Sequence, residues 1–141
     1  MPPLHPLVVH IPIGILLLAV VLEVVALCTK RAELSSFGWW AQILGSAGLV
    51  AAVLTGLLAE RAASISPGAR NTFENHEQLA FLTTSLFCVL LLWRIASRGK
   101  IPPSAPRLFV LLLAAGIAAL LTTAWFGGEL VYRFGTGLHL P

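Results

Sequence analysis

The chain is predicted to be an all-α integral membrane protein, a four-helix up-down bundle. Hydrophobic residues make up 57% of its 141 residues and charged residues only 11%, whereas a soluble domain is about 25% charged. The apolar residues fall into four stretches, each close to the roughly 20 residues that a helix needs to cross a bilayer. Because lipid offers no hydrogen-bond partners, each stretch must pair its own backbone groups, which favours helices.

The four predicted spans together account for nearly the whole chain, so residues 1–141 are expected to form a single domain. No basic segment precedes the first span and no small-residue cleavage site follows it, so we expect the first helix to be retained. Asn71 is predicted to cap the third helix, with Glu74 placed three residues later as in a capping box. The spans cover about residues 7–28, 38–58, 76–95 and 107–126.

The basic residues predict the orientation of the bundle in the membrane. Six basic residues lie on the side of the membrane where the first span ends, and three lie on the side where it begins. This bias places the six-residue face in the cytoplasm and both termini outside it. The isoelectric point of about 9.4 therefore reflects cytoplasmic links, and no basic stripe with interleaved aromatics indicates a nucleic-acid partner. The six are Lys30, Arg31, Arg94, Arg98, Lys100 and Arg107, and the three are Arg61, Arg70 and Arg133.

All four histidines fall on the same predicted face of the membrane. His5 and His10 lie at the start of the first span, His76 opens the third, and His139 follows the fourth. Imidazoles gathered at one depth of a small bundle can ligate a metal ion or a haem iron. The chain has two cysteines but no C-x-x-C-H attachment sequence, so a haem would be held without covalent bonds.

Helical spacing predicts which histidines act together. One turn after His10 comes Gly14, and one turn after His76 comes Ala80, so a small residue leaves room for a flat group beside each ring. The first and third helices of an up-down bundle are usually diagonal. His10 and His76 are therefore predicted to be the axial pair that approaches a macrocycle from its two sides.

Other residues have two interpretations each. The second span carries small residues on one face, including Gly45 and Gly48, which either accommodate the edge of a macrocycle or permit close helix packing. His5 precedes Pro6 and either caps the first helix or serves as a substitute ligand, also for a second haem. His139 is a lower-ranked ligand near the C-terminus.

Glu23 lies well inside the first span. A carboxyl group at that depth indicates a functional or strongly paired residue. We expect Glu23 to be protonated and hydrogen-bonded to another helix, with proton movement or contact with a partner subunit as alternatives.

The histidine-containing segment at the start of the chain also resembles the signature of a known family. The opening Leu4-His5-Pro6-Leu7-Val8-Val9-His10-Ile11-Pro12-Ile13 resembles the His-Pro-x-x-Val-His-x-Pro signature of a family of small bacterial four-helix membrane proteins. Thr55-Gly56, His76, Gly127-Gly128-Glu129-Leu130-Val131-Tyr132 and Gly135-Thr136-Gly137 are similar to that pattern too. The resemblance implies an integral membrane protein that is associated with haem and with respiratory components. His139 lies outside the motif.

These observations favour a membrane-embedded b-type cytochrome module with one haem b, or two, near the outer face. Two imidazole ligands leave no open position on the iron, which favours electron transfer over oxygen binding, and quinol, cytochrome c or other respiratory-complex subunits are the expected partners. The chain is thus expected to be an electron-transfer subunit rather than a stand-alone enzyme. The alternatives are a non-catalytic assembly or anchor subunit, acting in a homo- or hetero-oligomer, and a metal-binding protein that uses His5, His10, Glu74, His76 and Glu77.

Overall fold

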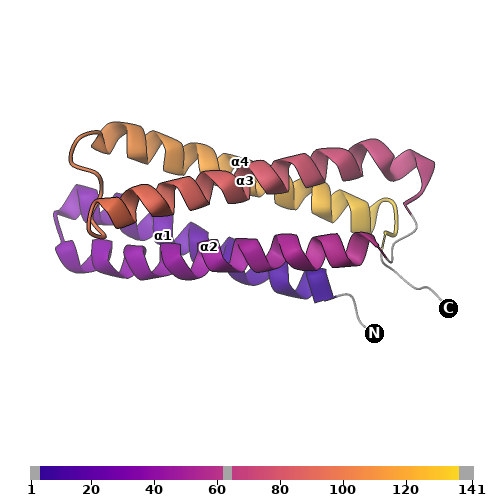
Figure 1. Cartoon of the computed structure of the whole chain (residues 1–141), viewed down its shortest axis with the longest axis horizontal. Helices are drawn as coiled ribbons and strands as arrows, with labels where there is room; N and C mark the ends of the chain where they lie inside the picture. The colour runs from indigo at the N-terminus through magenta and orange to yellow at the C-terminus, as the bar shows by residue number, and fades with distance from the viewer. Residues whose placement is uncertain (1–3, 62–64, 137–141) are drawn as a thin grey trace.

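A computed structural model describes residues 4–61 and 65–136 of the chain. Within these residues four long helices run side by side, and a single 3-10 turn, η1 (Pro67–Ala69), precedes the third (Figure 1). Each of the four is long and apolar enough to cross a membrane, which confirms the predicted all-α four-helix membrane bundle. The helices are α1 (Leu4–Thr29), α2 (Ala32–Glu60), α3 (Arg70–Ala96) and α4 (Pro106–Tyr132).

The helices are longer than the apolar stretches that predicted them. Each continues for one or more residues beyond its predicted bounds, because a helix does not end where its side chains become polar. The predicted cap at Asn71 is wrong. The η1 turn leads directly into α3, whose N-cap residue is Ala69 and which receives no side-chain cap. Asn71 therefore lies inside the helix, and Glu74 accepts a hydrogen bond from Arg70 at 2.9 Å instead.

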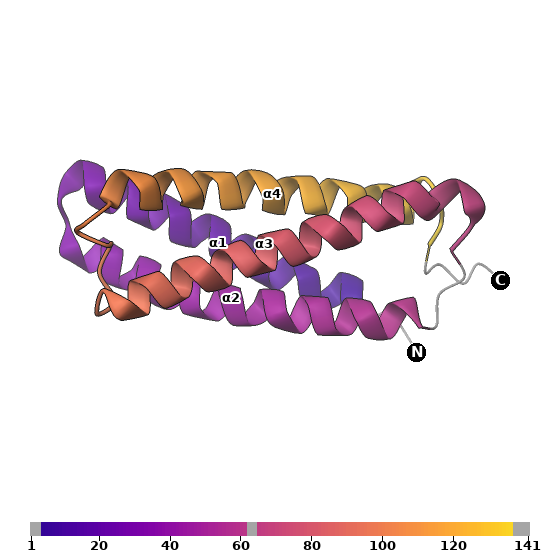
Figure 2. The ribbon, with the colours of Figure 1, turned by 45° about the horizontal axis from the view of Figure 1, so that its top comes forward.

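The bundle is built from two hairpins, α1–α2 and α3–α4. Helix contacts are densest within each hairpin, while α2–α3 and α1–α4 are the neighbouring pairs between hairpins. In Figure 2, accordingly, α3 crosses in front of the more distant α1, with α4 above them and α2 below. Glycines make the close approach possible. A Cβ atom on Gly45 would come within 2.5 Å of Leu16, and one on Gly48 within 2.9 Å of Pro12. The two hairpins thus pack internally through small residues, as membrane helices commonly do.

The two hairpins repeat the same packing with an offset of 71 residues. Every buried position of α3 has a buried counterpart at that offset in α1: Pro12 with Thr83, Leu16 with Phe87, Ala19 with Leu90 and Glu23 with Arg94. Five of the six buried positions of α2 and α4 correspond at the same offset, the exceptions being Ser46 and Leu130: Gly38 with Phe109, Gln42 with Leu113, Gly45 with Gly116, Leu49 with Leu120 and Ala52 with Thr123.

This correspondence describes an internal repeat that is hidden at the level of residue identity. The contacts repeat as well, since a Cβ on Gly116 would meet Phe87 at 3.1 Å as one on Gly45 would meet Leu16. Equivalent residues from the two hairpins also meet each other: His5 lies against His76, and Glu23 pairs with Arg94. Contacts between equivalent positions arise where two units are related by an approximate two-fold axis. That axis runs along the bundle, with the histidines near one end and the ion pair near the other.

Candidate histidine site

His5 and His76 meet at the end of the bundle where α1 and α3 begin. Their ring centroids are 6.2 Å apart and their ring planes make an angle of 76°. Both rings are partly buried between the helices. The two imidazoles therefore come from equivalent positions of the two hairpins and face the same small region near the bundle axis.

Hydrogen bonds fix the tautomer of both rings. The Nδ1 atom of His76 donates to the backbone carbonyl of Thr123 at 2.9 Å, because a carbonyl can only accept. The Nδ1 atom of His5 lies 3.2 Å from the hydroxyl oxygen of Thr55. That hydroxyl already donates its hydrogen to the carbonyl of Ala52 at 3.0 Å, so it accepts from His5. Both rings then carry the proton on Nδ1 and keep a lone pair on Nε2.

This arrangement is the one that metal-ligating histidines use. Such a histidine donates its other ring N–H to a carbonyl or a neighbouring side chain, which orients the ring and raises the basicity of the ligating nitrogen. Within the described residues, neither Nε2 atom takes part in a hydrogen bond. Two imidazoles that bind one metal ion from opposite sides have centroids about 6 Å apart, because each metal–nitrogen bond is about 2 Å long. The observed separation of 6.2 Å is close to that distance, and it is also the separation of an ordinary edge-to-face ring pair.

Two glycines hold the rings in place. A Cβ on Gly56 would come within 3.1 Å of Cε1 of His5, and one on Gly127 within 3.0 Å of Cε1 of His76. Each ring therefore lies directly against the backbone of the partner helix in its own hairpin, at positions that again differ by 71 residues. The absence of a side chain at Gly56 and Gly127 is what allows the two histidines to point toward the bundle axis.

The structure does not bring His10 to this site. His10 lies on the exposed surface of α1, where its Nδ1 atom contacts the carbonyl of Pro6, four residues earlier, at 2.6 Å. Five residues separate His5 from His10, which is a rotation of about 140° around a helix, so only one of the two can face the axis. The inward one is His5, the residue ranked in the sequence as a substitute ligand, and it takes the place predicted for His10 beside His76.

The small residues predicted to flank a cofactor have different surroundings. Gly14 lies on the exposed face of α1, with no atom within 4 Å of a Cβ placed there. Ala80 is half-buried on α3, one turn beyond His76. Gly45 and Gly48 face α1, and Leu16 and Pro12 occupy the space beside them. The geometry of these two glycines favours the helix-packing alternative.

Two further expectations concern ligand number. His139 lies outside the described residues. Among the residues that the structure does describe, no group of three or more His, Cys, Asp or Glu side chains is placed to hold a metal ion. His5, His10, Glu74, His76 and Glu77 therefore form no such cluster. The residues that do converge are a pair of imidazoles.

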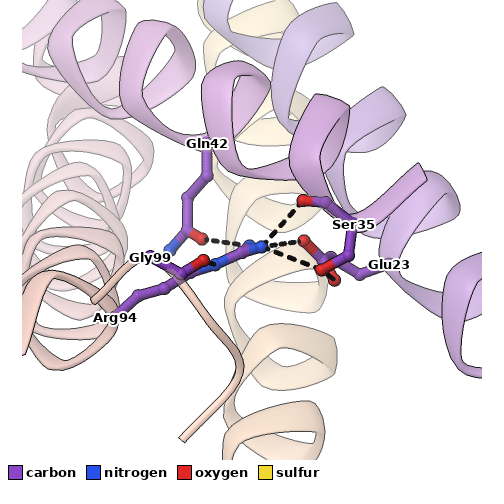
Figure 3. A network of polar contacts seen from close by, with 5 residues as sticks. All are labelled: Glu23, Ser35, Gln42, Arg94 and Gly99. Carbon is purple, nitrogen blue, oxygen red and sulfur yellow. Dashed lines mark hydrogen bonds and ion pairs between the residues drawn. The ribbon is translucent and has the colours of Figure 1, made fainter. Parts of the chain in front are cut away.

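A second polar cluster lies near the opposite end of the bundle, around Arg94. Its side chain is completely buried, and Glu23, with which it forms an ion pair, is 2% exposed. The two Nη atoms of Arg94 also donate to Oε1 of Gln42 at 3.1 Å and to the backbone carbonyl of Ser35 at 2.9 Å, and Nε donates to the carbonyl of Gly99 at 3.0 Å (Figure 3). One guanidinium thus connects α1, α2, α3 and the link that follows α3.

The sequence pointed to only half of this cluster. Glu23 does bond to another helix, as expected, but its partner is Arg94, so the contact is an ion pair and not the hydrogen bond of a protonated acid. Arg94 was counted among the basic residues of the cytoplasmic face, at the end of the predicted span 76–95; in the structure it lies in the last turn of α3 but is fully buried, with its guanidinium carbon 5.3 Å from the centroid of the Trp39 ring. The signal available was the apolar run Val89–Trp93 that leads into it: an arginine in the last turn of a span needs a buried acid or carbonyl partner when it faces inward.

The fold and the two polar clusters define a four-helix membrane protein with a histidine pair at one end and an ion pair at the other. The chain belongs to a family described as "Predicted membrane protein (DUF2231)", whose model matches residues 1–139. No curated protein and no solved structure shows significant similarity to the chain.

Proposed function

We propose that the protein is a membrane-embedded b-type cytochrome module in which His5 and His76 are the axial ligands of one haem. The observation that carries the proposal is the matched pair of Nδ1 hydrogen bonds. The Thr55 hydroxyl and the Thr123 carbonyl each engage one ring, and both Nε2 lone pairs remain available.

A pair of histidines is better suited to a haem than to a bare metal ion. Zinc and copper sites in proteins generally take three or four protein ligands, whereas a macrocycle supplies four nitrogens and needs only two from the protein. The described residues offer two converging imidazoles and no cluster of three ligands. A haem also suits the symmetry, because each of its two faces takes one ligand and the two histidines occupy equivalent positions on either side of the approximate two-fold axis.

Within this proposal each residue has a defined task. His5 and His76 bind the iron, Thr55 and the Thr123 carbonyl orient the rings, and Gly56 and Gly127 let the rings approach the axis. When bound, the haem supplies one-electron transfer, and two imidazole ligands exclude oxygen from the iron. Quinol or an external cytochrome c is the expected electron partner. We further propose a bacterial inner membrane with both termini outside the cytoplasm, on the basis of the six-to-three excess of basic residues.

An absorption spectrum of the protein purified from membranes, with a pyridine haemochrome assay, tests the proposal. We expect a Soret band and a sharp reduced α-band from low-spin haem b. His5→Ala and His76→Ala should each abolish the low-spin spectrum, because alanine supplies no lone pair. His10→Ala is the matched control, since His10 lies on the same helix but is exposed.

The three variants distinguish the alternatives. Loss of the spectrum in His10→Ala but not in His5→Ala would restore His10 and His76 as the axial pair. A colourless wild-type protein that copurifies with zinc or copper would favour a histidine metal site. A colourless protein without metal would favour an assembly or anchor subunit.

A further inference from the structure

The buried polar side chains of the described residues lie in a line along the bundle. Their depth in the bundle can be counted in residues along each helix, starting from His5 and His76 or from Gly56 and Gly127, which face the two rings. On this count, a buried polar side chain recurs every three or four residues. Thr123 is four residues from Gly127, Thr83 is seven from His76, and Ser46 and Gln42 are ten and fourteen from Gly56. The set is completed by Glu23 and Arg94, each eighteen residues from its histidine. At about 1.5 Å of rise per residue, neighbours in this polar line differ in depth by about 4–6 Å.

Both ends of the polar line are hydrogen-bonded. At the histidine end, the hydroxyls of Thr83 and Thr123 are 3.2 Å apart, and the Thr123 carbonyl accepts from His76. At the other end, Gln42 accepts from Arg94, which pairs with Glu23. Between the depths of Thr83 and Gln42, therefore, none of these hydrogen bonds connects the polar line.

The unpartnered groups lie in that interval. Three buried side-chain atoms of the described residues make no hydrogen bond. One, Oε1 of Glu23, is satisfied by its ion pair with Arg94. The other two are Nε2 of Gln42 and Oγ of Ser46, on side chains that are each 2% exposed. The two residues are one helical turn apart and share a face of α2.

We propose that Gln42 and Ser46 form a binding site for internal water in the middle of the membrane. Lipid cannot satisfy an amide N–H or a hydroxyl, and a buried polar group without a partner is strongly unfavourable. Internal water takes such positions when two or more polar groups converge on it. Water bound to Nε2 of Gln42 and to Oγ of Ser46 extends the line toward the Thr83 hydroxyl, which is about one turn of helix away in depth and contacts the hydroxyl of Thr123.

The water reaches this site from the ion-pair end of the bundle. A cavity of about 130 Å³ opens there and is lined by residues that include Ala32 and Ser35. The hydroxyl of Ser35 donates to Oε2 of Glu23 at 3.0 Å and accepts from Arg94. Exchangeable protons thus extend from this cavity through the polar line to the hydroxyls of Thr83 and Thr123, and the backbone carbonyl of Thr123 accepts from His76. The site is independent of whether the histidine pair binds haem.

Hydroxyl-radical labelling in water enriched with ¹⁸O tests the proposal on the full chain in lipid nanodiscs. Radicals formed from bound water oxidise the side chains beside it. Phe87 and Leu90, both buried, lie at the depths of Ser46 and Gln42 and should be oxidised in the wild type. Ser46→Val removes the hydroxyl and fills its space, so the bound water and with it most of the oxidation of these two residues should be lost. Ser46→Thr should retain it.

The control is Ser85→Val, which changes an exposed serine of α3 and should leave the oxidation of Phe87 and Leu90 unchanged. Rapid mixing into ¹⁸O water tests the route, because Ala32→Trp covers the mouth of the cavity and should slow the appearance of ¹⁸O on both residues. A wild type in which Phe87 and Leu90 stay unoxidised overturns the water site even if Ser46→Val fails to fold. Equal oxidation in the wild type and Ser46→Val overturns it as well, and an unchanged rate in Ala32→Trp overturns the route.

Discussion

Glu23 and Arg94 occupy equivalent positions in the two hairpins, yet they carry opposite charges and pair with each other across the bundle. A strict repeat would place two like charges face to face near the axis, and like charges in a low-dielectric interior repel strongly. The pairing of an acid with a base at this position removes the repulsion. It also makes the two hairpins unlike, so that the chain has a unique register between them.

Removal of one partner of this pair should strongly destabilise the protein. Arg94→Met leaves a buried carboxylate without its cation, and breaking a buried pair in this way costs about 3–5 kcal/mol. The free energy of unfolding measured in a detergent titration should fall by that amount. Arg107→Met, at an exposed position of α4, should change it little. Because two apolar residues leave no unpaired charge, Glu23→Met combined with Arg94→Met should recover much of the loss; a double variant as unstable as Arg94→Met alone would contradict this account.

The orientation of His5 should depend on the Thr55 hydroxyl. Thr55→Val preserves the shape of the side chain but removes the acceptor of the Nδ1 hydrogen bond. If haem binds at the histidine pair, its affinity should fall about 10–100-fold, as it does when outer hydrogen bonds to metal ligands are lost, and Thr55→Ser should restore it. A haem titration measures the effect. Thr122→Val is the control, because the Thr122 hydroxyl is exposed and bonds only within its own helix; an equal loss in this variant would show that the effect is not specific to His5.

Gly127 should tolerate a methyl group less well than its neighbour Gly128. A Cβ at position 127 lies 3.0 Å from Cε1 of His76, whereas one at position 128 has Tyr132 at 3.9 Å as its nearest neighbour. Gly127→Ala must push the His76 ring away from α4 and weaken its bond to Thr123. The haem content of the purified variant should therefore fall, while Gly128→Ala should match the wild type. Equal haem content in both variants would argue that the ring position does not matter for binding.

Replacing a glycine by leucine should distinguish a glycine that packs against another helix from one that faces the lipid. Gly45→Leu introduces a side chain where Leu16 already lies within 2.5 Å of the Cβ position, and overpacking of this kind costs about 1–3 kcal/mol or more. Gly14→Leu meets open space and should leave the free energy of unfolding nearly unchanged. The same detergent titration compares them. Destabilisation by Gly14→Leu of the same size would indicate that another chain covers that face of α1.

The proposed orientation is checked with a reporter fused to the C-terminus. Because the basic residues favour a cytoplasmic location for the ion-pair end, an enzyme that is active only in the cytoplasm should be silent at this position. A second fusion in the link between α3 and α4 should be active. The reverse pattern would place the histidine pair on the cytoplasmic side.

The sequence by itself determined the class of the fold and the types of residue at its sites. Apolar stretches of about the length of a bilayer can satisfy their backbone only as helices, so four spans predict four helices regardless of how they pack. The same reading placed histidines at the starts of α1 and α3 and marked Glu23 as a residue that needs a partner. These are local properties, and they follow from composition and spacing.

Tertiary structure decided which of these residues meet. His5 and His10 differ by a rotation of about 140° on one helix, and only the packing of α1 on Gly45 and Gly48 turns His5 toward His76 and leaves His10 exposed. Arg94 looks like an ordinary basic residue at the end of a span until the two hairpins are joined, because its partners Glu23, Ser35 and Gln42 lie 52 or more residues away. The repeat shows mainly as a pattern of burial, with identical residues at only a few equivalent positions such as His5 and His76 or Gly56 and Gly127, since packing constrains the volume and direction of side chains more tightly than their identity.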